Sequence, residues 1–173
     1  MLEAGYIQVY TGEGKGKTTA AVGLAIRALG AGLKVAFLQF FKPETSSEVK
    51  ILKTFAPQLL YANFHTKGFV KRKPSLKLKE EILKGYSFFE NLLRERAYDV
   101  YILDEFVYAL NWNIIELEKF LNLLREKPKG VEIIITGRGA PQALIEVADL
   151  VTEMRSLKHY FDKGVKARCG IEK

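Results

Sequence analysis

The sequence predicts an α/β protein in which helices cover both faces of a mostly parallel central sheet, giving three layers. Two observations support this fold class. The first is a series of short, almost entirely apolar runs rich in β-branched residues. The second is that segments of helical periodicity separate these runs along the chain. Runs of this kind are typical of parallel strands that are buried on both faces. Neither a repeat nor a linker divides the 173 residues, so we expect a single domain over residues 1–173.

The elements can be placed in order along the chain. The apolar runs predict strands at residues 6–10, 34–40, 59–64, 100–104, 131–136 and 150–154. The segments between them predict helices at residues 17–31, 48–55, 75–97, 114–126 and 141–148. Ser75 can cap the third helix, and the fourth ends before Pro128. Ligands of such folds bind beyond the carboxyl ends of the strands, so functional residues are expected in the loops that follow them.

Composition restricts the class of protein further. Hydrophobic residues make up 48% of the chain and charged residues 27%, as in a soluble globular protein. No apolar run reaches the roughly 20 residues that a membrane-spanning helix needs. The N-terminus lacks the pattern of a secretion signal, and the single cysteine, Cys169, excludes an intramolecular disulfide. We therefore expect a cytoplasmic protein without a membrane partner.

The net charge of +7 is concentrated in one segment. Residues 66–84 contain seven basic side chains and two acidic ones, which gives 7 − 2 = +5. Such a segment can attract a polyanion, although most charge runs are solvated surface. Because the rest of the chain is nearly neutral, nucleic acid is not the expected partner.

A glycine-rich loop follows the first strand and leads into the first helix. Glycines allow backbone amides to approach an anion closely, and the N-terminus of the following helix attracts it. Lys17 can reach phosphate oxygens, and the hydroxyl of Thr18 can bind a magnesium ion. Although Thr11 replaces the first glycine of the standard pattern, this strand–loop–helix context predicts a phosphate-binding loop and a P-loop NTPase-like fold. The residues expected to bind a nucleotide are Gly12, Glu13, Gly14, Lys15, Gly16, Lys17, Thr18 and Thr19.

Two carboxylates end the strand at residues 100–104. Asp104 and Glu105 resemble a Walker-B element, which holds magnesium beside a P-loop. Side chains alternate along a strand, so we expect Asp104 and Glu105 to point in different directions. Together with Thr18 they predict a site for Mg²⁺ or Mn²⁺.

Other polar residues give weaker signals. Arg138 follows the strand at 131–136 and is a candidate for contact with an anion, with a plain turn as the alternative. The two histidines, His65 and His159, are not linked by spacing to any nucleophile. The sequence therefore predicts no general base.

Taken together, these motifs resemble the P-loop-type ATP:corrinoid adenosyltransferases, the cob(I)alamin adenosyltransferases. The resemblance runs in the same order along nearly the whole chain. The alternating-glycine loop, the Thr-Gly-Arg-Gly turn and the Lys-His-x-Phe-Asp-x-Gly motif are in combination far more specific than a P-loop alone. The matching segments are residues 10–21, 39–40, 103–105, 136–141, 148–154 and 158–167.

The resemblance implies a reaction in which the 5′-deoxyadenosyl group of ATP moves to the Co(I) of a corrinoid and triphosphate is released. Reduced cobalt is then the nucleophile at the ribose C5′ carbon, and no general base is required. The enzyme would position that carbon, stabilise the leaving triphosphate and exclude oxidants. The resemblance also implies a homodimer. A reductase protein would supply Co(I), and its docking on the basic segment 66–84 is a hypothesis.

Carried over position by position, the resemblance assigns ATP to residues 12–19 and catalytic roles to Lys17 and Phe69. Phe69 would press against the lower face of the corrin, displacing the axial ligand and making Co(II) easier to reduce. Magnesium would be bound by Thr18 and Glu105. The further candidates for corrinoid contact are Gln39, Phe40 and Arg138.

The residues alone leave two other functions open. A small P-loop kinase or NTPase would cleave between phosphates and produce ADP. A nucleic-acid-binding ATPase using residues 66–84 would bind polynucleotides in a salt-dependent manner. The product formed from ATP distinguishes the adenosyltransferase from both alternatives.

Overall fold

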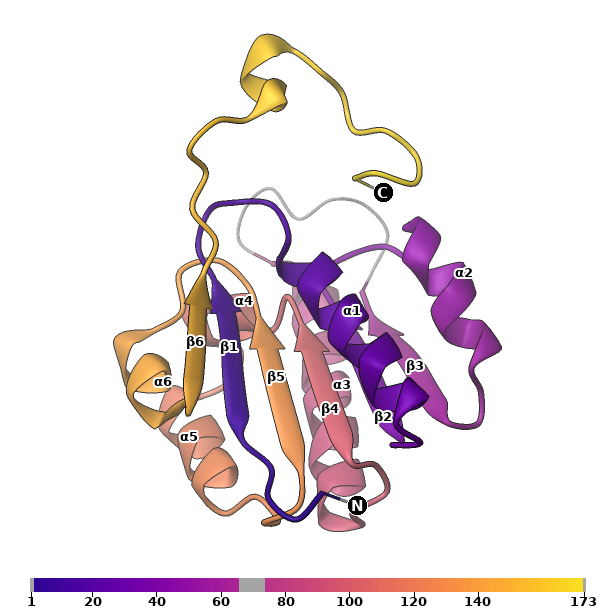
Figure 1. Ribbon diagram of the computed structural model, residues 1–173. Coiled ribbons are helices and arrows are strands. Elements are labelled where there is room, and N and C mark those ends of the chain that lie inside the picture. Colours follow the sequence, from indigo (N-terminus) through magenta and orange to yellow (C-terminus); the bar gives the residue numbers. More distant parts are fainter. Residues whose placement is uncertain (1, 66–73, 173) are drawn as a thin grey trace.

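The computed structural model describes residues 2–65 and 74–172, which form a six-stranded sheet with helices on both faces (Figure 1). The strands run in the order β3-β2-β4-β5-β1-β6, and each neighbouring pair is parallel. All six carboxyl ends therefore lie on one edge, at the top of Figure 1. The strands are β1 (Ile7–Thr11), β2 (Val35–Phe40), β3 (Leu59–Phe64), β4 (Val100–Asp104), β5 (Glu132–Thr136) and β6 (Leu150–Glu153).

The helices divide between the two faces of the sheet. Taken in chain order, the first two helices cover one face of the sheet and the next four helices cover the other face (Figure 1). Among the described residues, no helix is long and apolar enough to cross a membrane. The helices are α1 (Lys17–Gly30), α2 (Ser47–Thr54), α3 (Leu76–Arg94), α4 (Val107–Asn111), α5 (Leu117–Arg125) and α6 (Gln142–Val147), followed by the 3₁₀ turn η1 (Tyr160–Lys163).

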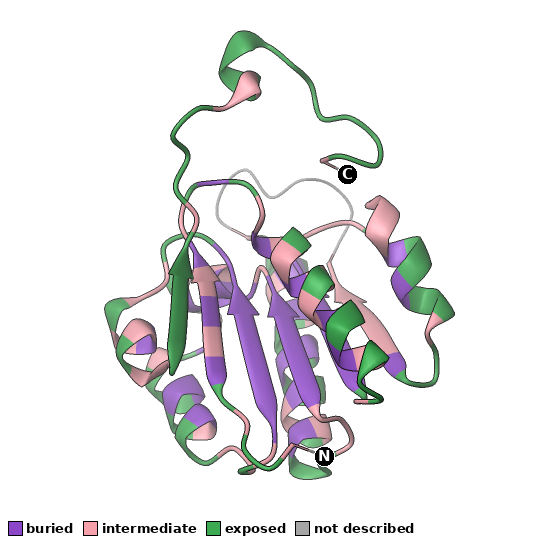
Figure 2. Ribbon diagram, in the orientation of Figure 1, coloured by how far each residue is buried: buried purple, intermediate pink, exposed green. Residues whose placement is uncertain are grey.

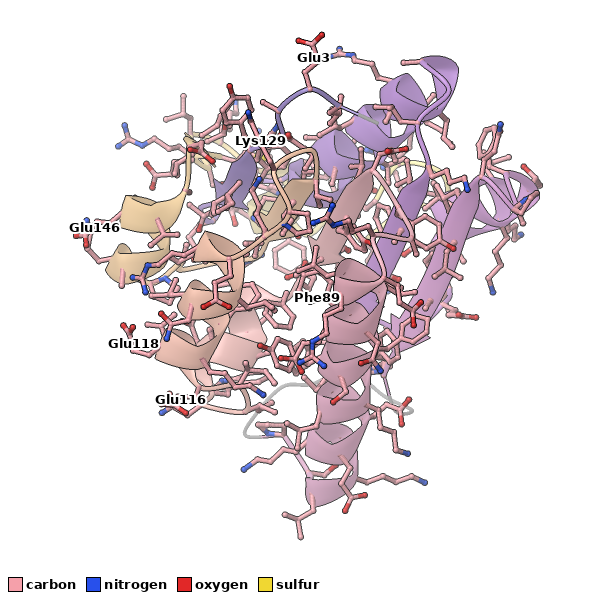
Figure 3. The ribbon with its side chains drawn as sticks, turned by 90° about the horizontal axis from the view of Figure 1, so that it is seen from below. Glu3, Phe89, Glu116, Glu118, Lys129 and Glu146 are labelled. Atoms are coloured by element: carbon pink, nitrogen blue, oxygen red, sulfur yellow. The ribbon has the colours of Figure 1, made fainter. Side chains whose placement is uncertain are left out.

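Side chains alternate between the two faces along each strand, so the sheet has one hydrophobic core on each face. On β5, the side chain of Ile134 packs under α1, whereas Ile133 and Ile135 face the opposite layer. Ala21 and Ala25 are fully buried on α1 and allow this helix to lie close to the sheet. In the other layer Phe89 of α3 is buried, while the labelled acidic side chains of α5 and α6 lie at the periphery (Figure 3).

Most predicted elements are confirmed, with two differences. The sheet is parallel at every described pairing, not merely at most of them. The helix expected at 114–126 is α5, which starts at Leu117, and α4 before it was not predicted because its short apolar run lacks polar spacing. The Ser75 cap is confirmed: its Oγ accepts a hydrogen bond from Leu78 N at 3.2 Å.

Burial falls steeply from the centre of the sheet to one edge. Every residue of β4 and β5 is buried, whereas every residue of β6 is exposed (Figure 2). Residues 155–172, called the C-terminal arm below, continue from β6 above the carboxyl edge and are mostly exposed. The predicted functional loops therefore lie between a buried sheet and this arm.

Candidate active site

The loop after β1 adopts backbone conformations that need glycine. Gly12 has φ +94° and Gly16 has φ +121°, both in the region that side chains disfavour. Gly14 is required for a different reason, since a Cβ there would lie 2.6 Å from the carbonyl oxygen of Met154. The Gly14 amide donates a hydrogen bond of 2.6 Å to this same oxygen. The alternating glycines thus allow the loop to curl against the end of β6.

The side chain of Lys17, the first residue of α1, points back into the loop. Its Nζ donates hydrogen bonds to the carbonyl oxygens of Gly12 at 2.6 Å and Gly14 at 2.8 Å. Burial lowers the pKa of Lys17, and no carboxylate of the described residues lies within ion-pair distance of its Nζ. A buried ammonium that contacts only neutral carbonyls favours an approaching anion.

The N-terminus of α1 adds to this preference. Gly16 is the N-cap, no side chain caps the helix, and its first turn contains no acidic residue. The amides of a first helical turn have no partner within the helix, and they carry part of the positive end of its dipole. Loop, lysine and helix therefore form a site for phosphate groups.

Beside the loop, four polar side chains meet at the carboxyl ends of β2 and β4. Thr18 Oγ1 donates to Asp104 Oδ1 at 2.8 Å. Lys42, two residues after β2, donates to Thr18 Oγ1 at 2.6 Å. Its Nζ also lies 3.4 Å from Asp104 Oδ2 and 3.0 Å from Glu105 Oε1. We refer to Thr18, Lys42, Asp104 and Glu105 as the edge cluster.

Opposite charges keep Asp104 and Lys42 ionised. Burial alone would raise the pKa of Asp104, but the Lys42 ammonium and hydrogen bonds from Gln39, Thr136 and Thr18 lower it overall. Burial likewise opposes the charge on Lys42, yet the two carboxylates raise its pKa above the usual range. The ion pair between Lys42 and Asp104 is therefore present at neutral pH.

The orientation of Glu105 corrects the prediction from strand alternation. Asp104 and Glu105 were expected to point in different directions, but both carboxylates contact Lys42. The strand ends at Asp104, and Glu105 turns into the left-handed region with φ +61°. Its amide donates to Thr136 Oγ1 at 2.9 Å, which fixes the turn. Conformations of this kind are costly and concentrate at functional sites.

The edge cluster fits a magnesium ion in its donor chemistry. A hydroxyl and carboxylates are hard oxygen ligands, and Glu105 Oε2 is buried without a hydrogen-bond partner among the described residues. Across residues 2–65 and 74–172, no group of three or more His, Cys, Asp or Glu side chains could hold a metal ion. A cation here would therefore share its coordination with phosphate oxygens and water, as Mg²⁺ commonly does.

The predicted residues on the outer side of the loop are exposed. Glu13 points away from the loop interior and pairs with Arg138, whose Nη1 lies 2.9 Å from Glu13 Oε2. Lys15 contacts the C-terminal arm, with its Nζ 3.2 Å from both Tyr160 Oη and Glu172 Oε1. Thr19 is exposed on the first turn of α1.

Of the candidates for corrinoid contact that the structure describes, Gln39 and Phe40 are buried and Arg138 is exposed. Gln39 is fully buried, where it donates to Asp104 Oδ2 at 3.0 Å and accepts from Tyr61 Oη at 2.8 Å. Phe40 is also fully buried and packs against Phe64 and Phe106. Phe69 lies outside the described residues. The corrinoid assignment of Gln39, Phe40, Phe69 and Arg138 stays a prediction.

Sequence reasoning missed two members of this arrangement. Lys42 belongs to no motif that the sequence analysis used, and its position two residues after a predicted strand was the only available signal. Thr136 was predicted as the end of a strand and the start of the Thr-Gly-Arg-Gly turn, with no role in the site, but its Oγ1 donates to Asp104 Oδ1 at 2.8 Å. This hydrogen bond connects β5 to the edge cluster.

The parallel sheet, the glycine loop and the Asp-Glu strand end define a P-loop nucleotide-binding fold. A solved structure with a similar fold is the flagellar accessory protein FlaH from Methanocaldococcus jannaschii, with a TM-score of 0.58. The similarity covers 88% of this chain and 72% of that one at 16% sequence identity, so it concerns the fold alone.

Sequence comparison identifies the family. Residues 3–172 match the family described as ATP:corrinoid adenosyltransferase BtuR/CobO/CobP. The corrinoid adenosyltransferase of Escherichia coli K12 is 37% identical over 172 residues, covering 98% of this chain and 86% of the relative. The Pseudomonas aeruginosa enzyme of the same name is 34% identical over 174 residues, covering 98% and 84%. The chain belongs to the ATP:corrinoid adenosyltransferase family, a family of transferases.

Proposed function

We propose that this protein transfers the 5′-deoxyadenosyl group of ATP to the Co(I) of a corrinoid and releases triphosphate. The observation that carries this proposal is the family match over residues 3–172, combined with a phosphate site in which each loop glycine has a structural reason. ATP and a corrinoid are the substrates that the family uses. Because cobalt itself attacks carbon, the reaction requires no protein base.

The chain contributes mainly to the leaving group. Triphosphate carries several negative charges, and the buried Lys17 ammonium and the amides of the loop and of α1 provide fixed positive partners. Such groups are oriented before ATP binds, so they need little reorganisation during the reaction. Stabilising the departing triphosphate in this way lowers the barrier to carbon transfer.

A divalent cation at the edge cluster is part of the proposal. Thr18 and Glu105 would bind Mg²⁺ or Mn²⁺, and Asp104 would orient the Thr18 hydroxyl through the 2.8 Å hydrogen bond. When bound, the cation would neutralise charge on the triphosphate. Support comes from Glu105 Oε2, which has no hydrogen-bond partner among the described residues, and from the oxygen ligands that Thr18 and Glu105 offer.

The cellular setting remains a set of predictions. We infer a cytoplasmic homodimer that receives electrons from a separate reductase. An acidic reductase could dock on the basic segment 66–84, part of which lies outside the described residues. Neutralising Lys71, Arg72 and Lys73 together should slow the reductase-coupled rate and weaken its salt dependence, without changing the rate with chemically reduced corrinoid.

The reaction is tested by anaerobic incubation of the protein with Mg-ATP and chemically reduced cobalamin. We expect a light-sensitive cobalt–carbon product and triphosphate in equal amounts. Protein with K17M serves as a control for contaminating activity and should form both products about 100-fold or more slowly. Formation of ADP without a corrinoid product would contradict the proposal and favour a phosphotransferase or NTPase.

A further inference from the structure

The ammonium of Lys42 occupies the middle of the edge cluster. It contacts one oxygen each of Thr18, Asp104 and Glu105, at 2.6, 3.4 and 3.0 Å. Two of these three residues, Thr18 and Glu105, are the proposed ligands of the divalent cation. Lys42 therefore already makes contacts that a metal ion would need.

The backbone of Lys42 is fixed, whereas its long side chain can move. Phe41, just before it, has φ +58°, and Asn63 Nδ2 donates to the Lys42 carbonyl oxygen at 2.8 Å. About a third of the Lys42 side chain is exposed. A lysine head group on a flexible four-carbon stem can change partners without a change of fold.

The charges of the edge cluster do not balance. One ammonium faces two carboxylates, and Glu105 Oε2 is buried without a hydrogen bond among the described residues. The cluster can thus accept more positive charge than Lys42 supplies. An ammonium and a divalent cation cannot share these few oxygens, however, because they repel each other at such short range.

Resting on the proposed magnesium site, we propose that Lys42 is a resident counter-ion of the edge cluster that the divalent cation must displace. Once displaced, its ammonium moves to an oxygen of the triphosphate. Without ATP the released ammonium has no anion to contact, so the cation binds weakly. With ATP the triphosphate receives the ammonium, and metal and nucleotide bind together.

The test measures Mn²⁺ binding to the nucleotide-free protein by loss of the EPR signal of free Mn²⁺. We expect K42M to bind Mn²⁺ about tenfold or more tightly than the unsubstituted protein, because the competing ammonium is gone. K42R keeps the charge and should stay within about threefold of the unsubstituted protein. The matched control is K53M, since Lys53 forms an exposed ion pair with Glu44 at 3.0 Å outside the cluster.

A second variant locates the bound ion. Adding E105Q to K42M should abolish the gain in Mn²⁺ affinity. The proposal is overturned if K42M and the unsubstituted protein bind Mn²⁺ equally, or if the gain survives E105Q. Should K42M fail to fold, K42Q provides the same neutral comparison.

The titration uses neither ATP nor corrinoid, so it is independent of the reaction assay. If adenosyl transfer is absent but K42M gains Mn²⁺ affinity, the proposed reaction fails and the role of Lys42 stands. If adenosyl transfer is present and K42M gains nothing, the role of Lys42 fails and the proposed reaction stands.

Discussion

Two lysines of the same loop, Lys15 and Lys17, lie in opposite surroundings. Lys17 is buried and, within the described part of the chain, donates to the carbonyl oxygens of Gly12 and Gly14; burial lowers its pKa. Lys15 is exposed and contacts the C-terminal arm, where hydrogen bonding to Tyr160 and Glu172 raises its pKa. Among the described residues, the Lys17 ammonium contacts neutral carbonyl oxygens, whereas the Lys15 ammonium contacts the Glu172 carboxylate.

This difference teaches how a loop with several basic residues assigns their roles. A cation inside the loop has lost its water and gains most from a phosphate, whereas an exposed ion pair contributes little and is screened by salt. Sequence alone lists both lysines as ATP ligands. In the structure Lys15 contacts the arm, whereas Lys17 is buried, so the proposed role in binding ATP falls to Lys17.

The largest expected effect tests Lys17 directly. K17M removes the buried ammonium, and we expect the rate of adenosyl transfer to fall about 100-fold or more, because leaving-group stabilisation is lost. K15M is the matched control and should change the rate by less than about threefold. Both are measured with Mg-ATP and chemically reduced cobalamin. Equal losses of rate in K17M and K15M would show that the two lysines do not differ in their contribution to the reaction.

The next prediction concerns Gly14, which directly precedes Lys15 and contacts Met154 at the end of β6. In G14A the new Cβ would lie 2.6 Å from Met154 O, so we expect a loss of about 1–3 kcal/mol in the free energy of unfolding. G23A is the control: apart from its chain neighbours and the backbone of its own helix, no atom of the described residues lies within 4 Å of the new Cβ, and a helical alanine should stabilise by about 0.5–1 kcal/mol. Urea denaturation measures both. A neutral G14A would show that loop and β6 are not packed as described.

The edge cluster beside the loop should make the stability of the protein depend on pH. Despite its burial, Asp104 has a lowered pKa because of Lys42 and three hydrogen bonds, so its stabilising contribution is complete above the ordinary value of 3.8. The contribution is lost as the pH falls through the folded-state pKa, since the unfolded chain takes up the proton first.

We therefore expect the unsubstituted protein to lose more stability than D104N between about pH 7 and about pH 3. At neutral pH D104N should be less stable by about 1–3 kcal/mol, because it disrupts a buried network. Thermal unfolding across this pH range measures both effects. Parallel pH profiles would show that Asp104 is not the responsible group.

The smallest effect is expected at the outer side. Glu172 contacts Lys15, Tyr160 and Arg168, and E172Q removes its charge from all three. We expect faster proteolysis within the arm and an ATP affinity within about twofold of the unsubstituted protein. R125Q, which affects an exposed ion pair on α5, is the control. A large loss of ATP affinity in E172Q would assign the arm to the nucleotide site.

Much of the fold could be predicted because its signals are local. The runs of β4 and β5 are buried and mostly apolar, and the Ser75 cap is visible in the sequence. The short α4 could not be predicted, since five residues within an apolar stretch have no readable period. Its placement depends on tertiary contacts that the chain makes elsewhere.

The candidate site divides in the same way. The phosphate loop and the Asp-Glu strand end are contiguous motifs, so the sequence predicts them. Lys42 is brought to Asp104 only by the pairing of β2 with β4, which places residues far apart in sequence side by side. The turn of Glu105 toward Lys42 depends on its left-handed backbone, which a strand pattern does not predict.

The order of strands has a consequence for synthesis of the protein on the ribosome. β1 leads into the phosphate loop. Its residue Val9 pairs with Ile135 of β5 on one side and with Val151 of β6 on the other. At a translation rate of about 5–20 residues per second, β1 is made on the order of ten seconds before its neighbours β5 and β6. During this time both edges of β1 are unpaired. The Gly14 amide meets its acceptor only once Met154 has been made. ATP can therefore stabilise this fold only late in translation, when the last strand has closed the sheet.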